Sequence, residues 1–185
     1  MPILLLLNGP PGIGKSTLAR RYVENHPLAF CLDIDELRRR VGQWEVHEQE
    51  SGLLARRMAI EMARTHLSAG HDVVVPQFLG RVHFIEQLEA MAVLAGARFV
   101  EVVLMDSKTQ ALSRFAARGK DPRTSAHHRE AARTAGGTAG LTEMWERLQD
   151  VVAQRPRATV VQTLAGDVDG AYAALLVALR RSAQD

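Results

Sequence analysis

The sequence has little of what export, membrane insertion or a disulfide framework would require. Its one cysteine, Cys31, excludes an internal disulfide and a zinc site built from cysteines, which is typical of a reducing compartment. No apolar run reaches the length of a transmembrane helix. The opening residues, MPILLLL, have neither the basic region nor the long apolar stretch of a signal peptide. We therefore expect a cytoplasmic protein without a membrane partner.

The chain also lacks a large excess of charge of either sign. The chain of 185 residues has 23 Lys and Arg against 21 Asp and Glu, a formal net charge of +2. A strongly basic domain is the usual footprint of a nucleic-acid-binding protein, so we expect no nucleic-acid partner. The three arginines at 38–40 stay open to two interpretations, an anion site or a solvated helix face. The length and the 46% hydrophobic content predict one folded domain over residues 1–185.

Short apolar runs alternate with segments of helical periodicity. The apolar runs predict strands at 3–7, 29–34, 72–76, 99–105 and 158–163. The helical segments are 15–25, 50–69, 81–95, 107–118, 141–153 and 168–181. Because the strands are continuously apolar, each must be buried on both faces. The sequence therefore predicts an α/β protein, a three-layer fold with a five-stranded parallel sheet.

One long segment lacks a face that could join the core. Residues 119–140 are polar and rich in Gly, Ala, Thr and Arg. Such a stretch inside a compact domain is usually either disordered or a functional lid. We predict a helical lid over 119–140, with Gly119 and the pair Gly136 and Gly137 as hinges.

The sharpest motif is GPPGIGKS, which follows the first predicted strand and opens the first predicted helix. It matches GxxxxGK[ST], the P-loop, whose glycines let backbone N–H groups turn toward phosphate. Lys15 would reach the β- and γ-phosphates, and Ser16 would bind Mg²⁺. A glycine turn without a ligand is a poor alternative, because Lys15 would then lie over a positive helix end. The predicted ligands are ATP and Mg²⁺, and the predicted nucleotide-binding residues are Gly9, Pro10, Pro11, Gly12, Ile13, Gly14, Lys15, Ser16 and Thr17.

A P-loop does not name a reaction, because switches, motors and kinases all use it. The segment after the fourth strand, LMDSKTQAL, lacks the NKxD or TKxD motif by which a GTPase reads guanine. An ABC ATPase would need a signature helix and a much longer chain, and an AAA module would need a second subdomain. Of the P-loop classes considered, the sequence therefore fits the small kinases best.

Two carboxylates follow the second strand in LDIDELRRR. Asp33 and Asp35 are two residues apart, which in a strand places both on one face, at the edge where α/β sheets bind ligands. We predict Asp35 as the catalytic base for an acceptor hydroxyl, and Asp33 as a substrate residue that supports Mg²⁺ through water. Asp35 could instead, or also, be the N-cap of the next helix. Arg38 would hold the acceptor, unless it is merely exposed.

The third strand ends in VPQ, without the aspartate that often completes a metal shell. The sequence therefore leaves open which carboxylate supports Mg²⁺. Gln77 and Arg81 follow this strand and are predicted to bind substrate, although Arg81 could be a surface residue. Trp44 could stack on a ring of the substrate or pack against the protein.

Three arginines complete the predicted site. Arg114 and Arg118 are spaced i, i+4 on the helix at 107–118, and Arg123 lies in the predicted lid. We predict that Arg114 and Arg118 are catalytic and that Arg123 binds substrate, because guanidinium groups can compensate the charge of a transferring phosphoryl group. The alternative for the pair is a surface salt bridge.

Four segments, GPPGIGKST, LDIDELR, VVVPQFLGR and SRFAARG, resemble small P-loop phosphotransferases: zeta toxins, chloramphenicol phosphotransferase and gluconate-kinase-like enzymes. The resemblance implies that Asp35 activates the acceptor hydroxyl, as the second aspartate of the group's DxDxxR segment, with Arg38 as its arginine. VVVPQFLGRVHFIEQL and VVLMDSKTQALSRF look similar to tunicamycin-resistance proteins, which implies a nucleoside-type antibiotic or a UDP-sugar-like acceptor. The VPQ segment departs from the acidic segment of zeta toxins and argues against a toxin.

Together these features predict an ATP-dependent kinase that phosphorylates a hydroxyl of a small molecule, as a monomer or homodimer. The alternative is an NTP-binding regulatory module that acts through a protein partner. A kinase for nucleic-acid 5′ ends is disfavoured by the modest charge. The identity of the acceptor stays open.

Overall fold

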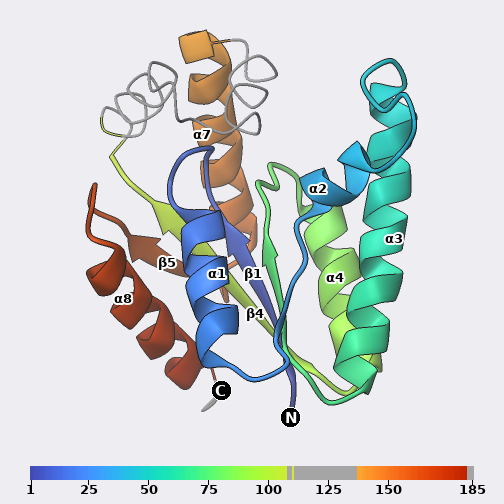
Figure 1. The fold of residues 1–185 in the computed structure, drawn as a ribbon. Helices are drawn as coiled ribbons and strands as arrows, with labels where there is room; N and C mark the ends of the chain where they lie inside the picture. The colour runs from blue at the N-terminus through green and yellow to red at the C-terminus, as the bar shows by residue number, and fades with distance from the viewer. Residues whose placement is uncertain (108–109, 111–136, 183–185) are drawn as a thin grey trace.

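The computed structural model describes residues 1–107, 110 and 137–182. Within them the chain forms one five-stranded parallel sheet, flanked by helices on both sides (Figure 1). The strands lie in the order β2-β3-β1-β4-β5. Their bounds are β1 Ile3–Asn8, β2 Phe30–Cys31, β3 Val73–Pro76, β4 Arg98–Met105 and β5 Thr159–Gln162. The predicted α/β fold with a parallel sheet is confirmed.

Apart from α2, for which no range was predicted, the described helices agree with their predicted positions within a few residues. They are α1 Lys15–Asn25, α2 Ile34–Arg39, α3 Glu48–Ser68, α4 Val82–Leu94, α7 Gly137–Gln154 and α8 Val168–Arg181. Helix α7 begins at Gly137, earlier than the predicted start at residue 141. The predicted hinge role of Gly137 stays a prediction. The end of the predicted lid therefore overlaps α7. Nearly all of the predicted helix at 107–118 and the rest of the lid, including Gly119 and Gly136, lie outside the described residues.

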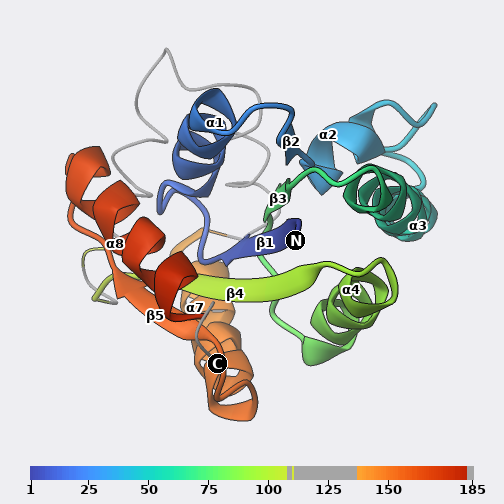
Figure 2. The same cartoon turned by 90° about the horizontal axis from the view of Figure 1, so that it is seen from below.

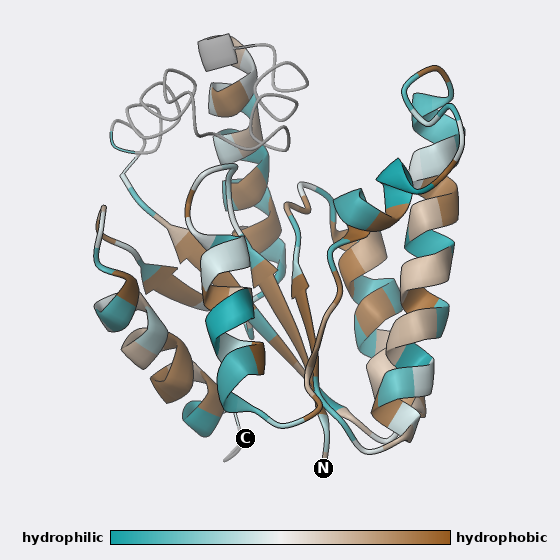
Figure 3. Ribbon diagram, in the orientation of Figure 1, coloured by the Kyte–Doolittle hydropathy of each residue, from teal (hydrophilic) through white to brown (hydrophobic). Residues whose placement is uncertain are grey.

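Two apolar layers cover the sheet, with α1 and α8 on one face and α3, α4 and α7 on the other (Figure 2). The residues of β1 alternate between them: Leu4 and Leu6 pack toward α3 and α4, whereas Leu5 and Leu7 pack toward α1 and α8. Figure 3 shows the resulting apolar strands between amphipathic helices. Burial on both faces explains why the strand sequences are continuously apolar.

Strand β1 is the centre of the sheet, because it pairs with both β3 and β4. Its carboxyl end carries the P-loop, and the segments that follow β2 and β3 leave the sheet at the same edge (Figure 1). In open parallel sheets this edge is where ligands bind. The fold therefore gathers most of the predicted site residues at one end of the molecule.

The predicted strand at 29–34 is wrong in its second half. β2 has only two residues, and α2 begins at Ile34 because Asp33 caps it. The Asp33 carboxylate accepts hydrogen bonds from the backbone N–H groups of Asp35 (3.0 Å) and Glu36 (3.2 Å). Asp33 and Asp35 thus do not share a strand face, and the N-cap is Asp33, not Asp35. An aspartate at this position satisfies helix donors that would otherwise be unpaired, which outweighs continuing a strand at the sheet edge.

No helix in the described part of the chain is both long and apolar enough to cross a membrane.

Candidate active site

The P-loop is a turn of residues 9–14 between β1 and α1, and its shape depends on glycine. Gly9, Gly12 and Gly14 have φ angles of 150°, 83° and 112°. A Cβ on Gly9 would lie 2.7 Å from the carbonyl oxygen of Leu104 on β4. Ile13 is buried in the core and anchors the loop. Positive φ and close backbone approach together leave little choice but glycine at Gly9.

Lys15 is the first residue of α1, and its ammonium lies across the loop. Its Nζ donates to the carbonyl oxygens of Gly9 (2.8 Å) and Pro10 (3.0 Å). The first turn of α1 has no acidic residue, and Gly14, its N-cap, provides no side-chain cap. A helix N-terminus with a lysine and no competing carboxylate attracts an anion. The arrangement fits the phosphates of a nucleotide.

The following two residues, Ser16 and Thr17, are exposed at the start of α1. The described residues contain no group of three or more His, Cys, Asp or Glu side chains that could hold a metal ion by themselves. A Mg²⁺ ion does not need such a group in a nucleotide site, because it usually keeps several waters and binds phosphate oxygens with one or two protein ligands. An exposed Ser16 hydroxyl beside the loop fits one of those ligands.

The structure brings together two of the residues predicted on the acceptor side. Asp35 is exposed in the first turn of α2, and the Nε2 of Gln77 donates to its Oδ2 at 3.3 Å. The Gln77 backbone N–H donates to the carbonyl oxygen of Leu7 on β1 (3.1 Å). The other amide atom of Gln77, Oε1, is buried and has no hydrogen-bond partner among the described residues. Gln77 therefore orients the Asp35 carboxylate from the end of β3.

Arg38 lies in a different setting, between α2 and α3. Its Nε donates to the Oγ of Ser51 (3.2 Å), its guanidinium lies 5.1 Å from the ring centroid of Trp44, and its Nη2 is 3.8 Å from a carboxylate oxygen of Glu48. Ser51 is buried, and its hydroxyl is also within hydrogen-bond distance of the Trp44 carbonyl. These contacts hold Arg38 and Trp44 against the start of α3. Their predicted substrate contacts stay predictions.

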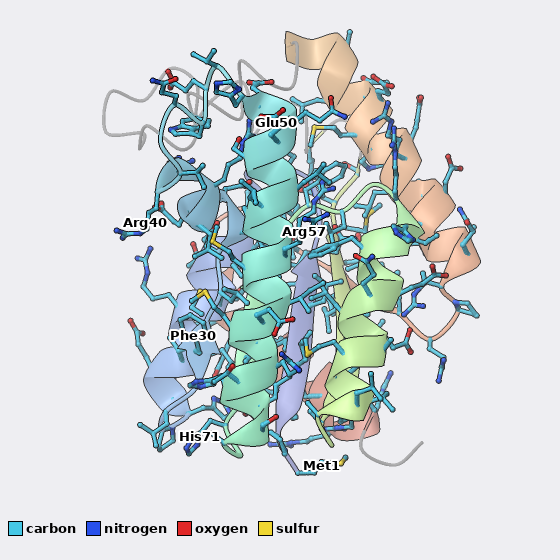
Figure 4. The ribbon with its side chains drawn as sticks, turned by 90° about the vertical axis from the view of Figure 1, so that its right-hand side faces the viewer. Met1, Phe30, Arg40, Glu50, Arg57 and His71 are labelled. Atoms are coloured by element: carbon cyan, nitrogen blue, oxygen red, sulfur yellow. The ribbon has the colours of Figure 1, made fainter. Side chains whose placement is uncertain are left out.

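The arginines at 38–40 do not point to a common anion. Arg39 forms an ion pair with Glu36 at 2.9 Å, one turn earlier on α2. Arg40 extends into solvent from the end of α2, away from α3 (Figure 4). Arg81 is likewise exposed, as the N-cap residue of α4. The solvated-face interpretation therefore describes Arg40, whereas Arg38 and Arg39 are partly buried and held by their neighbours.

The sequence reasoning missed one residue at this edge, Asn8, the last residue of β1. Asn8 is fully buried. Its Oδ1 accepts from the backbone N–H groups of Gly9 (2.8 Å) and Leu79 (2.9 Å), and its Nδ2 donates to the Leu79 carbonyl (3.0 Å). A signal was present in the sequence: a buried apolar strand that ends in an amide side chain needs partners for it.

The surroundings of Cys31 disfavour a reactive thiol. It packs against the core beside α1, and burial, reinforced by the negative charge of Asp33, raises its pKa to about 11. A thiol with such a pKa has little thiolate at neutral pH, and the thiolate is the reactive form.

Arg114, Arg118 and Arg123 lie outside the described residues, so their predicted contacts stay predictions.

The P-loop, the parallel sheet and the carboxylate beside it define the chain as a P-loop protein with a kinase-like fold. Residues 4–138 match the model of an AAA domain family, a family of P-loop kinases, and the chain belongs to this family. The family model is described as an AAA domain, although the sequence analysis set AAA modules aside because they would need a second subdomain. Proteins of this kinase family generally bind ATP with Mg²⁺.

Solved structures with the same fold cover almost the whole chain. A gluconokinase from Sinorhizobium meliloti 1021 is 19% identical, with a TM-score of 0.61 over 100% of this chain and 98% of its own. The tunicamycin resistance protein of Deinococcus radiodurans is 17% identical, with a TM-score of 0.59 over 100% of this chain and 95% of its own. At these identities the likeness shows the fold. No curated protein matches the sequence.

Proposed function

We propose that the protein is an ATP-dependent kinase that transfers the γ-phosphoryl group to a hydroxyl of a small molecule. The observation that carries the proposal is the position of Asp35: an exposed carboxylate, oriented by Gln77, at the same sheet edge as the P-loop. In the proposal this carboxylate takes the proton of the acceptor hydroxyl, a role that an exposed carboxylate at this edge can fill. Family membership supports the same class of reaction.

In this proposal the residues divide the work between donor and acceptor. The P-loop N–H groups and Lys15 hold the β- and γ-phosphates, and Ser16 is a ligand to Mg²⁺, which neutralises charge on the phosphate oxygens when bound. The acceptor oxygen attacks the γ-phosphorus as the bond to the β-phosphate oxygen breaks, so that ADP leaves with the electron pair. Asp35 takes the proton of the hydroxyl.

We further propose that the acceptor is a nucleoside-type antibiotic such as tunicamycin, or a UDP-sugar-like compound, and that the protein serves resistance. The support is the resemblance of the segments after the third and fourth strands to tunicamycin-resistance proteins. The structural likeness to the Deinococcus protein agrees with it at the level of the fold. A gluconate-like acceptor is the competing class, because a gluconokinase shares the fold equally well.

The proposal also includes the remaining site residues, the compartment, the oligomeric state, the partners and the domain organisation. Arg114 and Arg118 stabilise charge on the transferring group, and Arg123 and Arg81 contact the acceptor. The protein acts in the cytoplasm, as a monomer or homodimer, without a nucleic-acid or membrane partner. Residues 1–185 form one domain.

The test compares two matched substitutions in an ATP-coupled assay against tunicamycin, UDP-N-acetylglucosamine and gluconate. Asp35→Asn should lower transfer about 10²- to 10⁴-fold, the range for loss of a general base, while affinity for the non-hydrolysable ATP analogue AMP-PNP is kept. Asp169→Asn is the control, because Asp169 is also an exposed aspartate in the first turn of a helix, α8. It should leave both quantities unchanged.

Two outcomes would contradict the proposal. Transfer that persists in Asp35→Asn would remove the catalytic assignment. Tight AMP-PNP binding with no transfer to any of the three acceptor classes would favour the regulatory module, for which the partner would be a protein.

A further inference from the structure

Asn8 lies where the β1–β3 ladder ends. The last paired residues of the two strands are Leu7 and Pro76, and the Gln77 N–H still reaches the Leu7 carbonyl. Beyond this point β1 turns away into the P-loop, so the segment after β3 has no strand partner on that side. The side chain of Asn8 takes the place of the missing strand: its amide donates to the carbonyl of Leu79 and accepts from the N–H of the same residue.

This pairing requires asparagine. Its amide presents one donor and one acceptor side by side, as a backbone peptide does. Serine is shorter, and aspartate would turn the donor into a second acceptor facing the Leu79 carbonyl. Because Asn8 is fully buried, water cannot take over any bond that is lost.

The bonds of Asn8 connect the two halves of the proposed site. On one side Asn8 Oδ1 accepts from the N–H of Gly9, the first residue of the P-loop. On the other side Asn8 Oδ1 also accepts from the N–H of Leu79. Leu79 lies two residues after Gln77, and the Gln77 side chain donates to Asp35. The same segment is in contact with α7, since a Cβ on Gly80 would lie 3.4 Å from the Cβ of Arg147. The hydrogen bonds of Asn8, the chain segment 77–79 and the Gln77 bond to Asp35 therefore connect the phosphate loop to the carboxylate.

We propose that Asn8 is a positioning residue for phosphoryl transfer: through Leu79 and Gln77 it sets the P-loop and Asp35 in register, so that the acceptor oxygen lies in line with the γ-phosphate. This inference rests on the proposed kinase function. It adds a residue that touches neither nucleotide nor acceptor and acts through Gln77. A small displacement between donor and acceptor is enough to lower the rate strongly, because in-line transfer depends on their alignment.

The first test is hydrogen exchange of the whole protein with and without AMP-PNP and Mg²⁺. In the wild type AMP-PNP should slow exchange of the amides of residues 77–80 as well as those of the P-loop. Asn8→Ser should bind AMP-PNP within about 3-fold of wild type and lose the added protection at 77–80. Asn25→Ser is the control, because Asn25 is an exposed asparagine at the end of α1 and should change neither.

The second test is kinetic, with tunicamycin as the acceptor probe. Asn8→Ser should lower kcat about 10- to 100-fold with little change in the KM for ATP, since alignment and not binding is affected. In a Gln77→Leu background Asn8→Ser should add less than about 3-fold, because both substitutions break the same path. A merely structural asparagine would instead give effects on the rate that are additive with those of Gln77→Leu. A loss of thermal stability is expected in either case, because the lost bonds are buried.

The outcomes separate this inference from the function on which it rests. If AMP-PNP binds but residues 77–80 gain no protection in the wild type, Asn8 does not link the two halves and the inference fails, while the kinase proposal stands. Unchanged protection at 77–80 in a folded Asn8→Ser variant would have the same meaning. If the wild type does not bind AMP-PNP, the kinase function and the inference fail together.

Discussion

At each end of the β1–β3 pair one polar side chain connects the two segments. The two ends differ in whether the groups beyond that side chain are buried or exposed. At the amino end Asp72, just before β3, accepts hydrogen bonds from the Ile3 N–H and the Tyr22 hydroxyl, both at 2.8 Å. At the carboxyl end Asn8 pairs with Leu79. Tyr22 is 1% exposed, whereas Ser16 and Asp35 beyond the carboxyl end are exposed.

The comparison separates residues that we expect to stabilise the fold, at the amino end, from residues that we propose bind ligands, at the carboxyl end. At the amino end the donors and acceptors of Ile3, Tyr22 and Asp72 satisfy one another, and we expect this end to contribute to stability. At the carboxyl end Ser16 and Asp35, which lie beyond Asn8, are exposed, and the proposed ligands would bind there. Strand ends in parallel sheets place helix N-termini and loops on this side, which is the physical reason that ligands bind there.

The largest effect should come from the carboxyl end. Lys15→Met should lower transfer about 10³-fold or more by removing the cation that faces the phosphates. The free energy of unfolding should fall by only about 1 kcal/mol, from the loss of the half-buried Lys15 hydrogen bonds to the loop carbonyls. The measurements are an ATP-coupled assay and denaturant unfolding. Arg20→Met is the control, an exposed cation on the same helix, and a similar loss of activity in it would mean that general charge matters and not Lys15.

The second-largest effect is expected at a buried ion cluster near the start of β5. Arg155 contacts Glu101 on β4 (2.9 Å) and Glu89 on α4 (2.7 Å). Arg155→Leu should lower the free energy of unfolding by about 3 kcal/mol, because Glu101 would be a buried, unpaired charge. Arg157→Leu is the matched control: Arg157 also contacts Glu89, but its side chain is 89% exposed. It should cost less than about 0.5 kcal/mol.

The pH dependence of Arg155→Leu follows from the same contacts. Burial raises the pKa of Glu101 already in the wild type, and the Arg155 guanidinium opposes this shift. Without Arg155 the folded state should favour protonated Glu101 more strongly. A group whose pKa is raised in the folded state stabilises the fold at pH values below its ordinary pKa. This stabilisation is lost as the pH rises through the folded-state pKa. The deficit of the variant should therefore shrink as pH falls from 7 toward 5, and a constant deficit in urea unfolding would contradict this.

A smaller effect is expected at the amino end. Tyr22→Phe should cost about 1 kcal/mol, because Asp72 loses a hydrogen bond while the ring and its stacking on His26 at 3.8 Å are kept. Burial and the bond to Asp72 both raise the pKa of Tyr22, so the hydroxyl stays protonated. Thermal unfolding and the kinase assay measure the two effects. Transfer should be unchanged, and a loss of transfer at equal stability would break the division between the two ends.

The smallest effect concerns Cys31 in β2. Its pKa of about 11 lies above the ordinary value of 9.0, so the thiolate fraction near pH 8 should be about 100-fold lower than in an unfolded chain. Labelling with iodoacetamide in native buffer and in guanidinium measures the ratio. Equal rates in the two conditions would mean that this edge of the sheet is open to solvent.

Much of the fold could be predicted from the sequence because the signals are local. Continuous apolar runs gave the strands, and GPPGIGKS placed the phosphate loop between a strand and a helix. The signals failed where two local structures compete: the stretch at 29–34 is apolar enough for a strand, but Asp33 caps a helix instead. The site was predicted less completely, because pairings such as Gln77 with Asp35 join residues 42 positions apart.

The sequence by itself determined the chemistry that is possible here: a glycine-rich turn with Lys15 and Ser16, and a carboxylate pair after the second strand. Local backbone preferences and side-chain types suffice for that. Only the tertiary structure decided which carboxylate faces outward as a candidate base and which one caps a helix. It also decided that Asn8 joins the P-loop to the segment after β3, because such contacts form only when strands distant in sequence pair side by side.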